Sequence, residues 1–340
     1  MTEGLDIERP AELIAWLRSR GLIEPDEEPV VTVLPGGVSS RTVHLSSDRR
    51  DWVLKQPLGK LRVPVDWFSD PSRAHREASA LRWMSMLAPV GATPNLVFED
   101  RDDHIVAMTA VPAPHENWKA MLLAGNVQSV HVERFAEILA AIHIRSGERL
   151  TELVAEFGDN HFFRTLRLEP YFQYTARQLP SAGPFLDALC SETEAIKATL
   201  VHGDFSPKNV LVRPDGRLVL VDHEVAHIGD PAFDLGFSFA HLLAKAHHLP
   251  HSRASLLEAV RRYWAVYELR SRRASWRAGL EERAVRQTIG CLLARVAGRS
   301  QLEYLSLSEK ARQRDSALGL LGDPPVTVAA LVGAWEAAVA

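Results

Sequence analysis

Residues 200–236 read LVHGDFSPKNVLVRPDGRLVLVDHEVAHIGDPAFDLG, and this stretch constrains the fold more than any other part of the chain. NVLVR and RLVLVD are apolar runs of strand length, and the PDG between them is a turn sequence. A β-hairpin here would return Asp222, at the end of the second strand, to the side of Asn209, at the start of the first. Asp204 lies in the loop that leads into the hairpin. The pattern predicts that three oxygen-bearing side chains converge.

Carboxylate and amide oxygens suit Mg²⁺, which usually keeps waters or phosphate oxygens in its remaining positions. We therefore predict Asn209 and Asp222 as metal ligands. Glu224 follows Asp222 by two residues, and on an extended segment such residues point the same way, so Glu224 is a further candidate ligand. A surface carboxylate is the alternative for Glu224.

The spacing from Asp204 to Asn209 is that of a kinase catalytic loop. HGDFSPKN, followed by the hairpin and VD, resembles the aminoglycoside phosphotransferase and choline kinase-like family, whose HGD loop replaces the HRD of protein kinases. The resemblance implies an α+β, bilobal protein kinase-like fold and an enzyme that uses ATP and Mg²⁺. It also implies that Asp204 is the catalytic residue that takes the proton of the attacking hydroxyl. Asp234 would brace the HGD loop by accepting backbone hydrogen bonds.

The nucleotide half of such a site needs a cation on the phosphates, held by an acid on the neighbouring helix. Lys55 lies on the third predicted strand and Glu77 on the helix that follows, so we expect these two residues to fill the roles. In LPGGVSSR, between the first two predicted strands, Gly36 and Gly37 allow close backbone approach to phosphate and Ser39 offers a hydroxyl. A plain hairpin turn is the alternative for this segment.

Apolar periodicity divides the chain into two lobes. Residues 1–111 combine a short helix at 10–20, a strand meander, a helix that starts near residue 72, and two strands around an acidic turn, as expected of a nucleotide-binding lobe. Residues 112–340 are mostly helical and form the predicted catalytic and substrate lobe. Its later helices are expected at 253–270, 276–298, 308–321 and 326–339.

The acceptor is expected to be a small molecule, because only eleven residues separate Asp222 from Asp234, too few for an activation loop. HENWKAMLLAGNV, FFRTLRLEPYFQYTARQLP and GCLLARVAGRSQLEYLSLSEKARQRDSALGLL resemble methylthioribose kinase. That branch has an arginine pair where this chain has Ala294 and Arg295, and its loop after HGD reads LHTGS. Arg295 is thus the candidate substrate residue, with a solvated helix residue as the alternative.

The resemblance implies transfer of the γ-phosphate to a hydroxyl of a sugar-like acceptor, methylthioribose or a related pentose. An aminoglycoside or another amino alcohol is the alternative acceptor. An inactive kinase-fold binding module is the alternative of another class. The basic stretch at 261–287, with Tyr263, Trp264, Tyr267 and Trp276 interleaved, favours a neutral or anionic acceptor, unless it is a solvated helix face.

The charge balance and the hydropathy of the chain limit the classes of partner that it is expected to bind. The 39 basic and 43 acidic residues nearly cancel, so bulk charge indicates no nucleic-acid partner. No run approaches the ~18 apolar residues of a membrane helix, and MTEGLDIERP lacks an apolar signal region. We expect a cytoplasmic enzyme, monomeric or homodimeric. The histidines of 241–251 are expected to be exposed at a helix end rather than bound to zinc.

Overall fold

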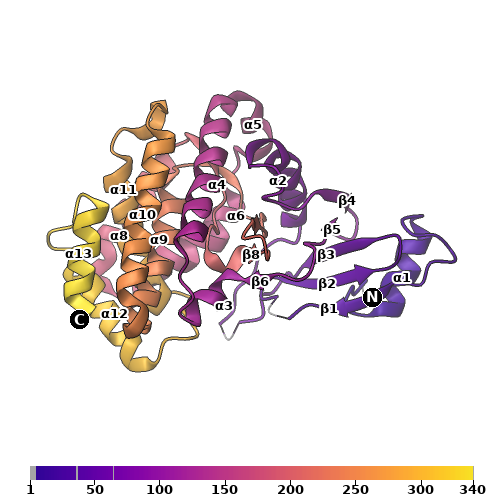
Figure 1. Ribbon diagram of the computed structural model, residues 1–340, viewed down its shortest axis with the longest axis horizontal. Coiled ribbons are helices and arrows are strands. Elements are labelled where there is room, and N and C mark those ends of the chain that lie inside the picture. Colours follow the sequence, from indigo (N-terminus) through magenta and orange to yellow (C-terminus); the bar gives the residue numbers. More distant parts are fainter. Residues whose placement is uncertain (1–4, 36, 64, 340) are drawn as a thin grey trace.

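The computed structural model describes residues 5–35, 37–63 and 65–339. Its first part is built on a five-stranded antiparallel sheet in the order β1-β2-β3-β5-β4. The strands are β1 (Val30–Val33), β2 (Ser40–Ser46), β3 (Asp51–Pro57), β4 (Leu96–Asp100) and β5 (Ile105–Thr109). Figure 1 shows this sheet at one end of the molecule and the packed helices at the other.

Helices cover both faces of the sheet. Leu13 and Leu17 of α1 (Pro10–Ser19) pack on alternate strand residues such as Leu54. The opposite face, which includes Val106, packs on Leu81 of α2 (Arg73–Leu87). Because successive strand residues point to opposite faces, Lys55, the cross-strand partner of Val106, lies on the α2 side. The sheet thereby aims Lys55 at α2.

The second part is mainly helical. Its bounds are α3 (Trp118–Leu123), α4 (Ser129–Glu148), α5 (Leu150–Phe157), α6 (His161–Phe163), the π-helix η1 (Arg164–Gln173), α7 (Tyr174–Gln178), α8 (Gly183–Ala195), α9 (Ala232–His248), α10 (Arg253–Ser271), α11 (Leu280–Ala297), α12 (Leu307–Gly319) and α13 (Val328–Val339). Short 3₁₀ turns cover Pro180–Ala182, Pro207–Asn209, Pro250–Ser252 and Ser275–Arg277.

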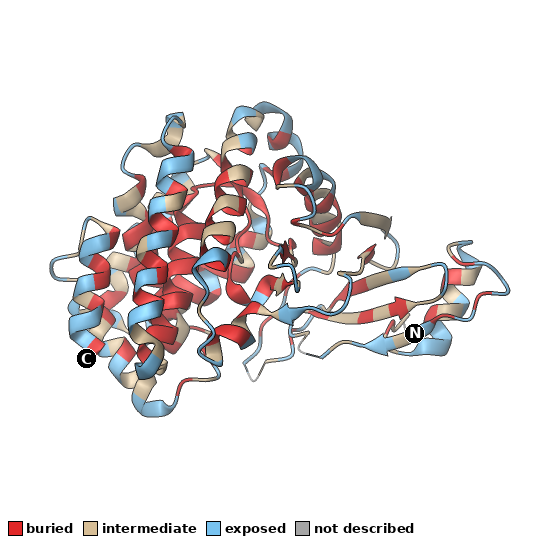
Figure 2. Cartoon of the chain, in the orientation of Figure 1, coloured by how far each residue is buried: buried red, intermediate tan, exposed pale blue. Residues whose placement is uncertain are grey.

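The α9 helix forms the centre of this part. All its residues except the last are buried, as expected of a helix that is apolar on every side. A Cβ on Gly236 would lie 2.3 Å from Cβ of Gln287, so glycine at this position allows α9 and α11 to pack closely. Figure 2 shows the buried residues concentrated where the helices pack together, with the outward faces of the outer helices exposed.

Short strands complete the fold. β8 (Val210–Val212) and β9 (Leu218–Leu220) form the hairpin predicted from NVLVR and RLVLVD, with Val210 opposite Leu220. β6 (Glu116–Asn117) pairs with β8, and β7 (Thr199–Val201) pairs with β10 (His227–Gly229). The hairpin is shorter than its apolar runs, but it brings Val221 within a backbone hydrogen bond of Asn209, at 2.9 Å.

Most of the predicted helices and strands form, and four local predictions are wrong. The helix expected from 276 begins at Leu280, because Ser275–Arg277 form a 3₁₀ turn. The segment after β9 is not extended, because Asp222 has a φ of 71°.

The other two corrections concern burial. The rings of His241 and His247 are buried rather than exposed. Tyr263 and Tyr267 are completely buried in the helical core, so the aromatics of the basic stretch do not form an acceptor surface. Over the parts of the chain that the structure describes, no helix is both long and apolar enough to cross a membrane.

Candidate active site

Asp234, in the first turn of α9, holds the HGD loop in place. Its carboxylate accepts hydrogen bonds from the backbone nitrogens of His202, at 2.7 Å, and Gly203, at 2.9 Å. Gly203 has a φ of 77°, and a Cβ there would lie 2.9 Å from a methyl group of Val225, so only glycine fits. This brace, which the family resemblance implied, sets the position of Asp204.

Two histidines support the same loop. His143 contacts Asp234 through Nε2, at 3.3 Å, and Tyr267 through Nδ1, at 2.8 Å. The ring of His202 is completely buried, and burial lowers its pKa, which keeps the imidazole neutral. Its Nδ1 can therefore accept the hydrogen bond that the backbone nitrogen of Asp204 donates, at 3.2 Å.

The side chain of Asp204 is fixed from two sides. Nδ2 of Asn209 donates to Oδ2 of Asp204, at 2.8 Å, and to its carbonyl oxygen, at 3.0 Å. Arg167, on the π-helix η1, forms an ion pair with Oδ2 at 3.1 Å and donates to the carbonyl of Gly203 at 2.6 Å. These bonds pre-organise the Asp204 carboxylate where the two lobes meet.

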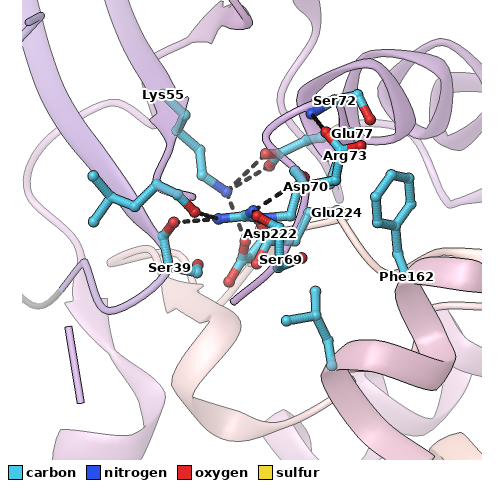
Figure 3. Close-up of polar contacts among 12 residues, drawn as sticks. Ser39, Lys55, Ser69, Asp70, Ser72, Arg73, Glu77, Phe162, Asp222 and Glu224 are labelled. Atoms are coloured by element: carbon cyan, nitrogen blue, oxygen red, sulfur yellow. Dashed lines mark hydrogen bonds and ion pairs between the residues drawn. The ribbon is translucent and has the colours of Figure 1, made fainter. Parts of the chain in front are cut away.

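Lys55 links the sheet, α2 and the end of the hairpin, as Figure 3 shows. Its ammonium donates to Glu77 at 2.8 Å and to Asp222 at 2.6 Å. Asp222 keeps a positive φ, which is uncommon for any residue except glycine and tends to occur at functional sites. The backbone turn at Asp222 directs its carboxylate to the lysine.

Burial and charge shift the pKa values of this trio. Burial disfavours the charge of Lys55, but the carboxylates of Asp222 and Glu77 outweigh burial and raise its pKa. Burial raises the pKa of Glu77 to about 7, and Lys55 opposes that rise. For Asp222, Lys55 outweighs burial and holds the pKa well below its usual range. The charge of Lys55 therefore stabilises the ionised forms of both buried carboxylates, Glu77 and Asp222.

Arg73, at the start of α2, holds Glu224. Its Nε donates to Oε2 of Glu224 at 2.9 Å, and the guanidinium also donates to the backbone carbonyls of Ser39 and Leu58 (Figure 3). Ser39 belongs to the glycine-containing turn between β1 and β2. One buried arginine therefore connects that turn to the carboxylate at 224.

Two cavities meet at these residues. The first lies between the sheet and the hairpin and is lined by Gly37, Ser39, Lys55, Thr109, Ala110, Val111, Asn209 and Asp222, among others. The second reaches into the helical part and is lined by Trp67, Arg167, Tyr171, Asp204, Glu224, Phe237, His241 and Arg295, among others. Val38, Ser39, Lys208 and Asp222 line both cavities. A group could pass from one cavity to the other at this junction.

The predicted site residues that the structure describes line these cavities, except Glu77, which is buried behind them against Lys55. Gly36 is the residue that the structure leaves undescribed. A Cβ on Gly37 would lie 2.2 Å from the carbonyl oxygen of Ser40, so the turn there requires glycine. Asp230, which precedes Pro231 at the start of α9, is buried and paired with Arg283 at 2.7 Å.

Three cations were missed by the sequence reasoning. Lys208 lies within HGDFSPKN, so its place in the catalytic loop was a usable signal. Arg73 and Arg167 gave no such signal, because their acidic partners are distant in the sequence.

The donor set at the junction fits a hard cation. Asn209 uses its amide nitrogen for both bonds to Asp204, which leaves the amide oxygen available, and Asp222 and Glu224 add carboxylates. Within the described ranges, no three His, Cys, Asp or Glu side chains form a metal site by themselves. Binding of Mg²⁺ here would therefore depend on the Asn209 oxygen and on nucleotide phosphates as well.

The sequence profile of the phosphotransferase enzyme family matches residues 30–279, more than half of the chain. The chain belongs to this family. The expectation that it is a phosphotransferase enzyme is thereby confirmed, whereas the methylthioribose kinase branch stays a prediction. Comparison with curated proteins finds no match.

Solved structures share the fold of this phosphotransferase. A choline/ethanolamine kinase family protein from Mesorhizobium loti has a TM-score of 0.52 at 14% identity, over 96% of this chain and 99% of that one. APH(2'')-IIa, in a ternary complex with streptomycin and ATP, has a TM-score of 0.53 at 15% identity, over 90% and 96% of the two chains. APH(2'')-IIIa, in a complex with GDP and kanamycin, has a TM-score of 0.53 at 16% identity, over 95% and 98%. The predicted α+β kinase-like fold is confirmed.

Proposed function

We propose that this phosphotransferase transfers the γ-phosphate of ATP to a hydroxyl of a sugar-like small molecule, with methylthioribose or a related pentose as the candidate from the sequence. The observation that supports this most is that Asp222 lines both cavities and Asp204 lines the cavity in the helical part. The cavity next to Lys55 would take the nucleotide, and the cavity in the helical part would take the acceptor.

In the proposed reaction, Asp204 orients the acceptor hydroxyl and takes its proton as the hydroxyl oxygen attacks the γ-phosphorus. The new oxygen–phosphorus bond forms as the bond to the bridging oxygen breaks, and ADP leaves. Lys55, held by Glu77, would contact the nucleotide phosphates, and Gly37 and Ser39 would cover them. Asn209, Asp222 and Glu224 would hold Mg²⁺, which supplies charge neutralisation on the phosphate oxygens.

Aminoglycosides are the second candidate acceptors, because two of the structural neighbours are complexes with streptomycin and kanamycin. The rings of Trp67, Tyr171 and Phe237 in the acceptor cavity do not separate the two candidates, because an aromatic face can pack on a sugar ring and also attracts a cation. An inactive binding module is disfavoured, because Lys55 and Asp204 are both present at the junction.

The test is an acceptor screen with the purified protein. ADP release and product mass are measured with ATP and Mg²⁺ against methylthioribose, 5-deoxyribose, kanamycin, streptomycin, choline and homoserine. We expect turnover with a sugar-like acceptor. Activity on an aminoglycoside alone would contradict the sugar-like acceptor but leave the proposed phosphate transfer intact. ATP binding without any turnover would support the binding module.

The role of Asp204 is tested by Asp204→Ala, which should lower kcat by about 10²–10⁴-fold, the usual contribution of a positioned general base. Asp215→Ala is the matched control, because Asp215 lies in the exposed hairpin turn and pairs with Arg217. Unchanged turnover in Asp204→Ala would show that Asp204 is not the general base.

A further inference from the structure

The carboxylates of the acceptor cavity are already neutralised by basic side chains. Three carboxylates line this cavity, and each is paired with a cation: Asp204 with Arg167, Asp222 with Lys55, and Glu224 with Arg73. Among the described residues that line the cavity, no further carboxylate remains for a cationic acceptor. A polycation entering it would find its potential partners occupied.

Unlike these paired carboxylates, Arg295 contacts neutral groups. Its guanidinium, on α11, donates to the hydroxyl of Tyr171 at 2.8 Å, and to the carbonyl and hydroxyl oxygens of Ser300 at 2.5 and 2.8 Å. These partners are neutral. Nε of Arg295 is buried and has no hydrogen-bond partner within the described part of the chain. Among the described residues, no carboxylate therefore pairs with Arg295 at the wall of the cavity, and Glu303 acts on its charge only from a longer distance.

More positive charge lies behind this wall. His241 lines the cavity, and Lys245, one turn further along α9, is completely buried. The ammonium of Lys245 donates to the backbone carbonyl of His241 at 3.2 Å and lies 5.4 Å from the ring centre of Tyr304. The Tyr304 hydroxyl is itself buried and unpartnered among the described residues. A buried ammonium is unfavourable unless an anion lies near it or it gives up its proton.

The pKa values of these groups are consistent with excess positive charge. Burial, together with the charges of Lys119 and Arg295, lowers the pKa of Lys245 to about 7. Burial and the surrounding cations also lower the pKa of His241 well below its usual value. The carboxylate that opposes this field is Glu303, and it is already paired with Lys119.

We propose that the acceptor of this enzyme carries an anionic group, a carboxylate or a phosphate, that binds to Arg295 while its reacting hydroxyl lies next to Asp204. This inference rests on the proposed phosphate transfer to a hydroxyl and narrows the acceptor to an anionic sugar-like molecule, which excludes the neutral methylthioribose. A guanidinium suits both anions, because it stays charged and forms charge-assisted hydrogen bonds to their oxygens. The anion would also compensate the positive field of Lys245, and the aromatic walls would contact the sugar ring.

The test compares four sugars of different charge. Glucose, glucosamine, glucuronate and glucose 6-phosphate share a pyranose ring, and the last two separate a carboxylate from a phosphate. Binding is measured by calorimetry with the nucleotide cavity saturated by AMP-PNP and Mg²⁺. We expect at least one anionic sugar to bind about tenfold or more tightly than glucose, and glucosamine to bind more weakly.

Variants on α11 assign the effect to one side chain. Arg295→Met should abolish the preference for the anion, and Arg295→Lys should retain part of it, which separates charge from folding. Arg286→Met is the matched control on the same helix, because Arg286 lies away from the cavity and pairs with Glu192. It should keep the full preference.

The outcomes distinguish this inference from the proposed function. Equal affinity for the four sugars, tighter binding of glucosamine, or no binding of either anionic sugar at millimolar concentration would overturn the anionic acceptor. Retention of the preference in Arg295→Met would overturn it as well. Failure of AMP-PNP to bind would instead count against the proposed kinase function, and the binding of the four sugars would still be measured without nucleotide.

Discussion

Arg73 and Glu224, which are 151 residues apart, form an ion pair at 2.9 Å at the centre of the molecule. The guanidinium is 0% exposed, and it also donates to the carbonyls of Ser39, Leu58, Ser69 and Asp70. One side chain therefore ties the β1–β2 turn and the start of α2 to the segment that follows the hairpin. The proposed metal ligand at 224 and the phosphate-covering turn are positioned by the same residue.

Arg73→Met should destabilise the protein strongly, because it leaves Glu224 buried without its cation. Removal of one partner of a buried ion pair costs about 3–5 kcal/mol in the free energy of unfolding. Arg82→Met, further along α2, is the matched control, because Arg82 is 47% exposed and its partner Glu99 still contacts His75 and Arg101, so we expect a loss of about 0–1 kcal/mol. Urea denaturation measures both variants, and equal losses would contradict the special role of Arg73.

Lys55→Met should destabilise the protein more at pH 8 than at pH 4. In the native protein the pKa of Asp222 is depressed, so its ion pair stabilises the fold above the ordinary pKa of an aspartate and is lost as the pH falls. Without Lys55, the buried Asp222 and Glu77 carboxylates are uncompensated whenever they are ionised, and at acid pH both can be protonated.

The expected loss for Lys55→Met at pH 8 is about 3–5 kcal/mol, decreasing toward pH 4. Lys60→Met is the control, because Lys60 pairs with Asp66 where both side chains are largely exposed. Denaturant titrations across this pH range provide the measurement. A loss that stays constant with pH would show that Lys55 acts through packing alone.

Lys245→Met should become more stabilising, relative to the native protein, as the pH falls. The pKa of Lys245 is lowered from 10.5 to about 7 in the fold, so the unfolded chain takes up its proton first and the native protein loses stability as the pH falls from above 10.5 through 7. Methionine carries no charge and avoids this loss, and the difference should reach a few kcal/mol near pH 7, on the order of 1.4 kcal/mol per pKa unit.

The groups that face Lys245 and share in this effect are Lys119, His241, Arg295, Glu303 and Tyr304. Thermal unfolding of native and Lys245→Met protein between pH 6 and pH 10 measures the trend. Lys310→Met, on α12, is the control, because its ammonium bonds to the neutral Gln301 at an exposed site and its loss should change stability little. A difference that does not vary with pH would argue against a desolvated ammonium at position 245.

Gly203→Ala should reduce both stability and kcat. The φ of 77° disfavours any side chain, and the new Cβ would lie 2.9 Å from Val225, which together cost about 1–3 kcal/mol. A shift of the HGD loop would also move Asp204 away from the acceptor hydroxyl. Gly322→Ala is the control, because a Cβ added at Gly322 would meet no atom within 4 Å beyond its chain neighbours. Full activity in Gly203→Ala would show that the loop tolerates a side chain.

Local sequence signals were sufficient for the framework of the site. Turn residues between two apolar runs predicted the β8–β9 hairpin, and apolar periodicity predicted α1, α2 and α10, because such patterns act over a few neighbouring residues. The loop spacing placed Asp204 and Asn209 together, and they hydrogen-bond at 2.8 Å. Periodicity failed where the backbone left regular geometry, at the positive φ of Asp222.

By itself, the sequence determined which elements form, the order in which they occur, and which oxygen-bearing side chains the catalytic loop presents. Only the tertiary structure decided which cation neutralises each of those side chains and which cation stays unpaired. Arg73 and Arg167 reach their carboxylates from helices far away in the chain, whereas the hydrogen bonds of Arg295 within the described residues go to the neutral Tyr171 and Ser300. Ion pairing depends on distances of a few ångströms between packed elements, and no local pattern encodes those distances.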